Sequence, residues 1–146
     1  MNHLLIALDF SQYSPDVENV GFALAKKIGA SVTLVAIINK FVDYVPVDTG
    51  QVFTSQWDAR KAMGLTSLEE VKKRHPEVPD IETICFIGDP KEDIINLSLK
   101  TKTTFIVIGT HGRTGVSHLM TGSTAEYVIR HSIIPIIVVP MNKKRH

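Results

Sequence analysis

The chemistry that this sequence could perform is concentrated in the glycine-rich stretch 109–124, which reads GTHGRTGVSHLMTGST. Glycine has no side chain, so the backbone N–H groups of such a stretch can approach a ligand closely. A helix predicted to begin near Ser123 adds unpaired N–H groups and the positive end of a helix dipole. The hydroxyls of Ser123 and Thr124 can donate further hydrogen bonds. These features predict a cradle for an anion, and phosphate is the anion that fits it best.

The spacing of the glycines differs from that of two common phosphate-binding motifs. The stretch contains no G-x-x-x-x-G-K-[ST] and no lysine, and its first three glycines are each three residues apart, unlike G-x-G-x-x-G. The pattern alone leaves a second interpretation open, a strand–helix connection in which the glycines only form turns. His111 could donate to a phosphate or fill the turn, and Arg113 could screen phosphate charge or remain solvated. No metal site is predicted at His111 and His118, because no cysteine or carboxylate completes the ligand set.

Five short apolar runs predict the strands that position this stretch. Most of them are nearly continuous in Val, Ile and Leu, which is typical of strands buried on both faces of a parallel sheet. The third run, IETICFI, is mixed and indicates an edge strand. The runs cover residues 4–8, 32–38, 81–87, 105–108 and 134–139.

Helical segments separate these runs. The first is predicted at residues 14–29 and the second at about 55–75, with a loop before the second helix. The third is predicted to start at Asp89 and the fourth at Ser123. Ser14 and Asp89 are candidate N-caps that precede proline, and Glu92 and Glu126 stand where they could complete capping boxes. In the first helix, one apolar stripe is expected, formed by Val17, Val20, Leu24 and Ile28.

This alternation of strands and helices predicts a parallel sheet with helices on both faces and right-handed crossovers. Ligands of such sheets bind beyond the carboxyl ends of the strands, where the strand order reverses. Asp9 and the stretch 109–124 each follow a predicted strand. A carboxylate is costly to bury without a partner, so Asp9 either contacts a ligand or forms a turn or cap at the start of the first helix.

The chain resembles the universal stress protein family. The nucleotide-binding signature of that family is G-x2-G-x9-G-[ST]. It matches Gly109 and Gly112, the nine residues 113–121, and then Gly122 and Ser123. The Asp-Phe-Ser after the first run and the closing Pro-Ile-Ile-Val-Val run match as well, so the resemblance covers the whole chain. One departure is Leu8, which stands where many members have proline before the aspartate.

This resemblance implies a Rossmann-like fold of the adenine nucleotide alpha hydrolase type, with a five-stranded parallel sheet of order 3-2-1-4-5. It also implies ATP as ligand, with or without Mg²⁺. The glycines would lie along the ribose and phosphates, Asp9 would face the ribose or base, and the backbone of Ile37 would read the adenine edge. The residues thus assigned to the site are Ala7, Leu8, Asp9, Ile37, Gly109, Thr110, His111, Gly112, Arg113, Gly122, Ser123 and Thr124.

Length and composition exclude several classes of protein. The 146 residues predict one domain, 1–146, with an ordinary 44% of hydrophobic residues. Sixteen basic residues against fifteen acidic ones argue against broad electrostatic binding of nucleic acid. One cysteine, Cys85, excludes a disulfide framework. No apolar run approaches the roughly 18 residues of a membrane span, and no signal peptide is recognisable, so we expect a cytoplasmic protein.

Three functions remain open from the sequence. The first, implied by the resemblance, is an ATP-binding regulatory protein of stress responses that forms a homodimer through residues 136–139. The second is a slow ATPase or autophosphorylating enzyme, although no P-loop lysine, evident base or arginine finger is present for phosphoryl transfer. The third is a scaffold that binds no nucleotide.

Overall fold

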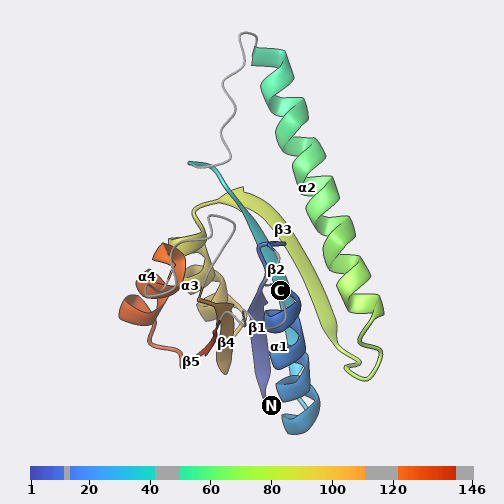
Figure 1. Cartoon of the computed structure of the whole chain (residues 1–146), viewed down its shortest axis with the longest axis vertical. Coiled ribbons are helices and arrows are strands. Elements are labelled where there is room, and N and C mark those ends of the chain that lie inside the picture. The colour runs from blue at the N-terminus through green and yellow to red at the C-terminus, as the bar shows by residue number, and fades with distance from the viewer. Residues whose placement is uncertain (12–13, 42–49, 111–121, 141–146) are drawn as a thin grey trace.

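The computed structural model describes residues 1–11, 14–41, 50–110 and 122–140, in which five strands alternate with four helices (Figure 1). The order of the elements along the chain confirms the predicted alternation. The elements are β1 (His3–Ala7), α1 (Ser14–Ile28), β2 (Ser31–Asn39), α2 (Gly50–Lys73), β3 (Ile81–Gly88), α3 (Pro90–Lys100), β4 (Phe105–Gly109), α4 (Ser123–His131) and β5 (Ile136–Val139).

The five strands form one parallel sheet in the order β3-β2-β1-β4-β5. The predicted fold class and strand order are therefore confirmed. The mixed third run is β3, which lies at one edge of the sheet as expected, and β5 lies at the other. Because β1 has β2 on one side and β4 on the other, the strand order reverses beside β1.

Side chains of alternate direction build a separate core on each face of the sheet. Leu4 and Ile6 of β1 pack in one core with residues of α1 and α2, including Phe22 and Leu68. Leu5 packs on the opposite face in a second core, to which α3 and α4 contribute. Figure 1 shows the two helix pairs on opposite sides of the sheet. Burial on both faces explains why the strand runs are continuously apolar.

The buried face of α1 matches the predicted stripe in part. Val17 is buried, and Leu24 and Ile28 are partly buried against the core, as expected. Val20 is wrong, because it is 42% exposed, and Gly21, Phe22 and Ala25 are buried although they were not predicted. The helix lies close to β1 at Gly21, where an added Cβ would stand 2.6 Å from a side-chain atom of Ile6. The glycine therefore lets α1 lie close to β1 at this point, and the residues around it are buried.

Helix α2 begins at Gly50, five residues before the predicted start, and its inner face is formed as predicted by Leu68 and Val71. Gly64 lies directly over β3, because an added Cβ there would be 2.5 Å from Sγ of Cys85. In Figure 1 the first turns of α2 extend past the carboxyl end of the sheet, while its last turn lies near the amino end. The helix therefore spans the whole length of the sheet.

Candidate nucleotide site at the carboxyl edge of the sheet

The predicted site residues that the structure describes converge on the carboxyl ends of β1, β2 and β4 and on the start of α4. Ala7 is the last residue of β1, and Gly109 is the last residue of β4, its neighbour. This edge, beside the reversal of strand order, is where an open parallel sheet binds its ligands. His111, Gly112 and Arg113 belong to residues 111–121, which lie outside the described part of the chain.

Asp9 lies in a turn between β1 and α1. The N–H of Leu8 still donates to the carbonyl of Val35 at 2.9 Å, and after it the chain leaves the sheet. Asp9 is exposed, and its Oδ1 accepts from the N–H of Ser11 at 2.9 Å and from Oγ of Ser14 at 3.1 Å. Asp9 therefore does form the turn that one interpretation predicted, and Oδ2 takes part in neither bond.

Two features of this turn were not predicted. Ser14, a candidate N-cap, is instead the first residue within α1. Its hydroxyl donates to Asp9. Phe10 adopts φ of 59°, the left-handed region that a residue with a Cβ rarely occupies. Such strain is often found at functional sites, where the surrounding structure maintains it.

Ile37 directs its backbone toward the same edge. The carbonyl of Val35 accepts from Leu8 and therefore points toward β1. Backbone groups alternate in direction along a strand, so those of Ile37, two residues further, point the same way. At that level β1 has already ended, at Ala7. The N–H and C=O of Ile37 thus face the space beyond the end of β1, while its side chain packs in the core of α3 and α4.

The two halves of the glycine motif meet at the end of β4. The N–H of Thr110 donates to the carbonyl of Val139 at 3.0 Å, which extends the β4–β5 pairing beyond Gly109. The carbonyl of Thr110 in turn accepts from the N–H of Gly122. The start of α4 is therefore held against the end of β4.

The capping box predicted at Ser123 and Glu126 is wrong. The helix begins one residue earlier than that box requires, so the N-cap position falls on Gly122, which makes no side-chain cap bond. Glu126 instead pairs with Arg130 at 2.8 Å. Ser123 is exposed and Thr124 partly buried. The N–H groups of this first turn therefore receive no side-chain cap from Gly122.

The predicted capping box at the start of α3 is correct in its cap but wrong in its partner. Oδ1 of Asp89 accepts from the N–H of Lys91 at 3.1 Å, as an N-cap should. The reciprocal bond, from the N–H of Asp89, goes to Oδ2 of Asp93 at 2.8 Å, not to Glu92.

In the described ranges, no three His, Cys, Asp or Glu side chains gather as possible metal ligands.

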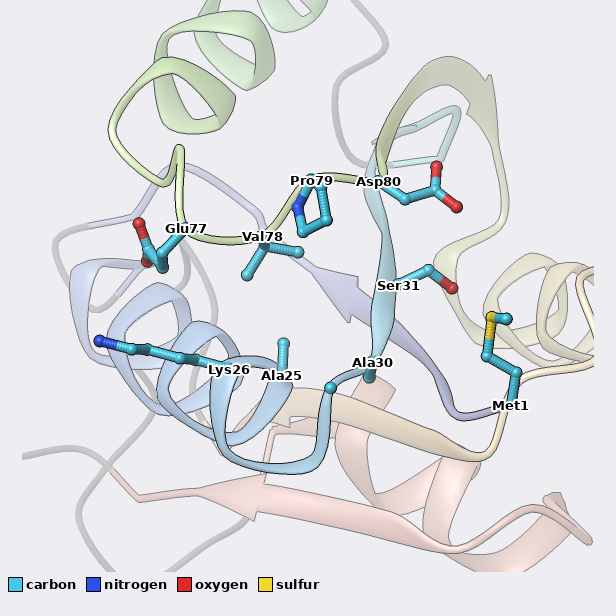
Figure 2. A pocket seen from close by; sticks show the side chains of 10 residues that line it. Met1, Ala25, Lys26, Ala30, Ser31, Glu77, Val78, Pro79 and Asp80 are labelled. Carbon is cyan, nitrogen blue, oxygen red and sulfur yellow. The ribbon is translucent and has the colours of Figure 1, made fainter.

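A shallow pocket of about 230 Å³ lies at the opposite, amino end of the sheet, and the sequence did not indicate it (Figure 2). Val78 and Pro79, just before β3, and Ala30 and Ser31, at the start of β2, form part of its wall. Glu77 and Lys26 stand together on one side of it in Figure 2. None of the predicted site residues lines this pocket, so it is separate from the carboxyl edge.

His3 forms a second polar cluster at the amino end. Its Nδ1 lies 2.6 Å from Oγ of Ser31, and its Nε2 lies 2.8 Å from Oγ1 of Thr33. Burial lowers the pKa of His3, and the charges of Asp80 and Glu82 oppose that shift without cancelling it. The ring is thus a neutral bridge between β1 and β2.

A parallel sheet of this order, with a helix start and a carboxylate at its reversal point, defines an α/β protein of the doubly wound class. Ligands of such sheets in general bind at the strand ends. Within this class the chain belongs to the universal stress protein family, whose family model matches residues 1–140. No helix in the described part of the chain is long and apolar enough to cross a membrane.

Two curated relatives and three solved structures illustrate this membership. The chain is 31% identical to universal stress protein MJ0531 of Methanocaldococcus jannaschii, over 97% of this chain and 83% of that protein. It is 28% identical to YxiE of Bacillus subtilis, over 94% and 98%. The fold matches UspA of Lactobacillus plantarum with a TM-score of 0.84 at 20% identity, covering 94% of this chain and 97% of that one.

The other two solved structures carry nucleotides. One is a universal stress protein in complex with cAMP, with a TM-score of 0.66 at 20% identity and coverage of 95% and 96%. The other is an Arabidopsis thaliana family member with AMP bound, with a TM-score of 0.68 at 16% identity and coverage of 99% and 95%.

Proposed function

We propose that this protein binds an adenine nucleotide, ATP, at the carboxyl edge of β1, β2 and β4, and that it acts as a nucleotide-responsive regulator in stress responses. The observation that carries the proposal is the bond from Gly122 to Thr110, which sets a helix start whose N-cap glycine supplies no side-chain cap beside the end of β4. Uncapped N–H groups at a helix start favour an anion. Two family members with the same fold hold AMP and cAMP, which supports an adenine nucleotide here.

The proposed roles follow from direction and charge. The phosphates lie against the first turn of α4 and the glycines of residues 109–122. The backbone of Ile37 faces the adenine edge, and Asp9 offers its Oδ2 to the ribose or base. A hydrogen bond to a charged group contributes about 1.5–3 kcal/mol, whereas an exposed charge pair contributes about 0–1 kcal/mol. Backbone donors should therefore matter more than Arg113.

Binding is favoured over rapid hydrolysis by the positions of the carboxylates. Asp9 holds the start of α1 and Asp89 caps α3, so both are engaged in fixing the backbone. Phosphoryl transfer needs a positioned cation and an oriented nucleophile as well as phosphate contacts. Slow hydrolysis or self-phosphorylation is the alternative, and phosphate release that is lost in Asp9→Ala while binding persists would favour it.

We further propose a homodimer that pairs β5 with its copy. Within the described chain β5 pairs only with β4, so one edge of Ile136–Val139 is open to a second strand. Two apolar side chains that precede β5 are also exposed, Ile129 by 48% and Ile133 by 86%. Ile133→Asp should convert a dimer to a monomer in light scattering. Leu99→Asp, at a 50% exposed position of α3, is the matched control and should leave the dimer intact.

The nucleotide proposal is tested by a thermal-shift series with ATP, ADP, AMP, cAMP and GTP, each with and without Mg²⁺. Ligand at about a hundred times its dissociation constant stabilises a protein by about 2.7 kcal/mol, a shift of roughly 5–11 °C at this size. Mass spectrometry of the denatured protein detects nucleotide retained through purification. An extract without nucleotide, together with no shift, would contradict the proposal and leave the scaffold function.

A further inference from the structure

Helix α2 is anchored to the rest of the protein along its second half. Leu68 and Val71 are buried in the core that lies between the sheet, α1 and α2. Just after the helix, Arg74 donates from Nη2 to Oε2 of Glu18 in α1 at 2.8 Å. Nε2 of His75 lies 2.7 Å from the other oxygen of Glu18, Oε1. The buried carboxylate of Glu18 therefore ties the end of α2 to α1.

The first half of α2 has much less packing. Of residues 56–67, whose side chains the structure describes, none is buried, and Met63 and Leu65 are 70% and 42% exposed. Figure 1 shows the first turns of the helix standing clear of the sheet beyond its carboxyl end. Isolated helices shorter than roughly 12–15 residues are marginal in water, because most helical stability comes from the packing of one face. This half of α2 therefore gains little from packing within the described part of the chain.

One stripe of α2 carries charges that are arranged symmetrically about an apolar centre. Leu65 is that centre, and Lys61 and Glu69 stand four residues to either side of it. Asp58 and Lys72 stand seven residues to either side. At 3.6 residues per turn, the five positions fall within an arc of about 80°, so they share one side of the helix. Four of these residues are exposed and Glu69 is partly buried. These five residues are called the α2 stripe.

The α2 stripe runs beside β3, the edge strand farthest from β5. Oε1 of Glu69 accepts from Oγ1 of Thr83 in β3 at 2.6 Å, and Oε2 takes no part in that bond. Burial raises the pKa of Cys85 in β3, and the charge of Lys61 opposes that shift, so Lys61 also lies near this strand. In the described chain no strand lies beyond β3, so the stripe borders an open side of the molecule.

We propose that the α2 stripe is a self-association surface, on which the same stripe of a second copy packs antiparallel with Leu65 beside its own copy on a two-fold axis. In such a symmetric contact, position i of one copy meets position j of the other, and j meets i. Antiparallel pairing about Leu65 therefore sets Asp58 opposite the partner's Lys72, and Lys61 opposite the partner's Glu69, each twice. Parallel pairing would set every charge against its own copy, so the charges select the antiparallel arrangement.

The α2 contact uses the edge of the sheet opposite to β5, so it can coexist with the proposed β5 dimer and join such dimers into larger assemblies. One helix from each copy makes a small contact beside the roughly 1,200–2,000 Å² of a stable interface. The association should therefore be weak, with a dissociation constant of about 0.1–1 mM. At about 10 μM it is almost unpopulated, and only pairing through β5 is expected there.

The test is sedimentation velocity of the full chain from about 10 μM to about 1 mM. The wild type should form species larger than those at the low concentration. In Ile133→Asp, which removes the proposed β5 pairing, monomers should give way to dimers over the same range, so the two contacts are measured separately. Because the charges of the α2 stripe are exposed, raising the salt from about 0.05 to about 0.5 M should weaken the association.

Lys72→Asp turns two attractive contacts with the partner's Asp58 into two repulsive ones and should weaken the association by about tenfold or more. Asp58→Lys should do the same, and the double variant should restore the association. Lys27→Asp, the same change of charge in the last turn of α1, is the matched control and should have no effect. No association of the wild type at about 1 mM, equal association in Lys72→Asp, or a double variant that does not associate would overturn the α2 contact.

Discussion

The hydroxyl of Ser14, the first residue of α1, donates to Oδ1 of Asp9 at 3.1 Å, and the same oxygen accepts from the N–H of Ser11. One carboxylate thus fixes the direction in which the chain leaves the central strand and enters its first helix. The turn former and the proposed ligand contact are the same residue. The two interpretations of Asp9 that the sequence left open are therefore compatible.

Asp9→Ala should lower both stability and nucleotide affinity, because it removes two hydrogen bonds and the proposed ribose or base contact. We expect a loss of about 1–3 kcal/mol in the free energy of unfolding, measured by denaturant titration. Ser14→Ala removes one of the two bonds and should cost about 0.5–1.5 kcal/mol while ATP still binds. Equal loss of binding in the two variants would show that Asp9 acts only through the turn.

Phe10→Gly should raise the melting temperature. A non-glycine residue in the left-handed region costs roughly 1–2 kcal/mol, and glycine avoids that cost at the φ of 59° found here. The gain corresponds to about 2–8 °C for a domain of this size. Gly29→Ala is the reciprocal control, because Gly29 has φ of 65° at the end of α1 and no neighbour within 4 Å of an added Cβ. It should lower the melting temperature; a gain there would contradict the backbone argument.

Gly64→Ala should be destabilising although alanine favours helices. The added Cβ would stand 2.5 Å from Sγ of Cys85, so α2 or β3 must shift, at a cost of about 1–3 kcal/mol. In the Cys85→Ala background the same change should become neutral or favourable, because the clash is gone and the helix propensity improves by up to about 1 kcal/mol. A double-mutant cycle by thermal unfolding measures this coupling, and strictly additive effects would refute the contact.

Stability should also fall in acid through Glu18. Its pKa is lower in the folded protein than its ordinary value of 4.5, so its contribution is complete above that value and is lost as the pH falls through the folded pKa. Glu18→Gln should cost about 1–3 kcal/mol at neutral pH and should flatten the melting-temperature profile below about pH 4.5. An acid limb as steep in the variant as in the wild type would assign the loss to other groups.

Continuous apolar runs predicted the parallel sheet well, because strands buried on both faces are short and nearly continuous in Val, Ile and Leu. Helix starts were predicted less well. A one-residue shift placed Gly122 instead of Ser123 at the N-cap of α4, and Asp93 instead of Glu92 closed the cap of α3. Such shifts depend on how each helix packs, which local sequence does not determine.

The features that the sequence did not predict depend on contacts between residues far apart in the chain. The sequence contains no sign that His75 meets Glu18, because 57 residues separate them and only the packing of α2 beside α1 joins them. The sequence alone does not explain a glycine at position 64, inside a helix. The structure does, because Sγ of Cys85 leaves no room for a Cβ there. For the site, the places of Asp9 and Gly109 just after or at strand ends could be predicted from the apolar runs, and that of Ile37 from the family resemblance, whereas the absence of a side-chain cap from Gly122 at the start of α4 needed the structure.

The most direct test of the nucleotide proposal is calorimetric titration of ATP into wild type, Gly122→Val and Arg113→Ala. Gly122 has φ of −57° and ψ of 152°, which valine can adopt, so the variant should fold and fail only where the ligand approaches the backbone. Circular dichroism and the ligand-free melting temperature check that it does. We expect no measurable binding to Gly122→Val and a loss of less than about tenfold in Arg113→Ala. Equal losses in the two variants, or unchanged affinity in Gly122→Val, would contradict a site built from backbone donors at the start of α4.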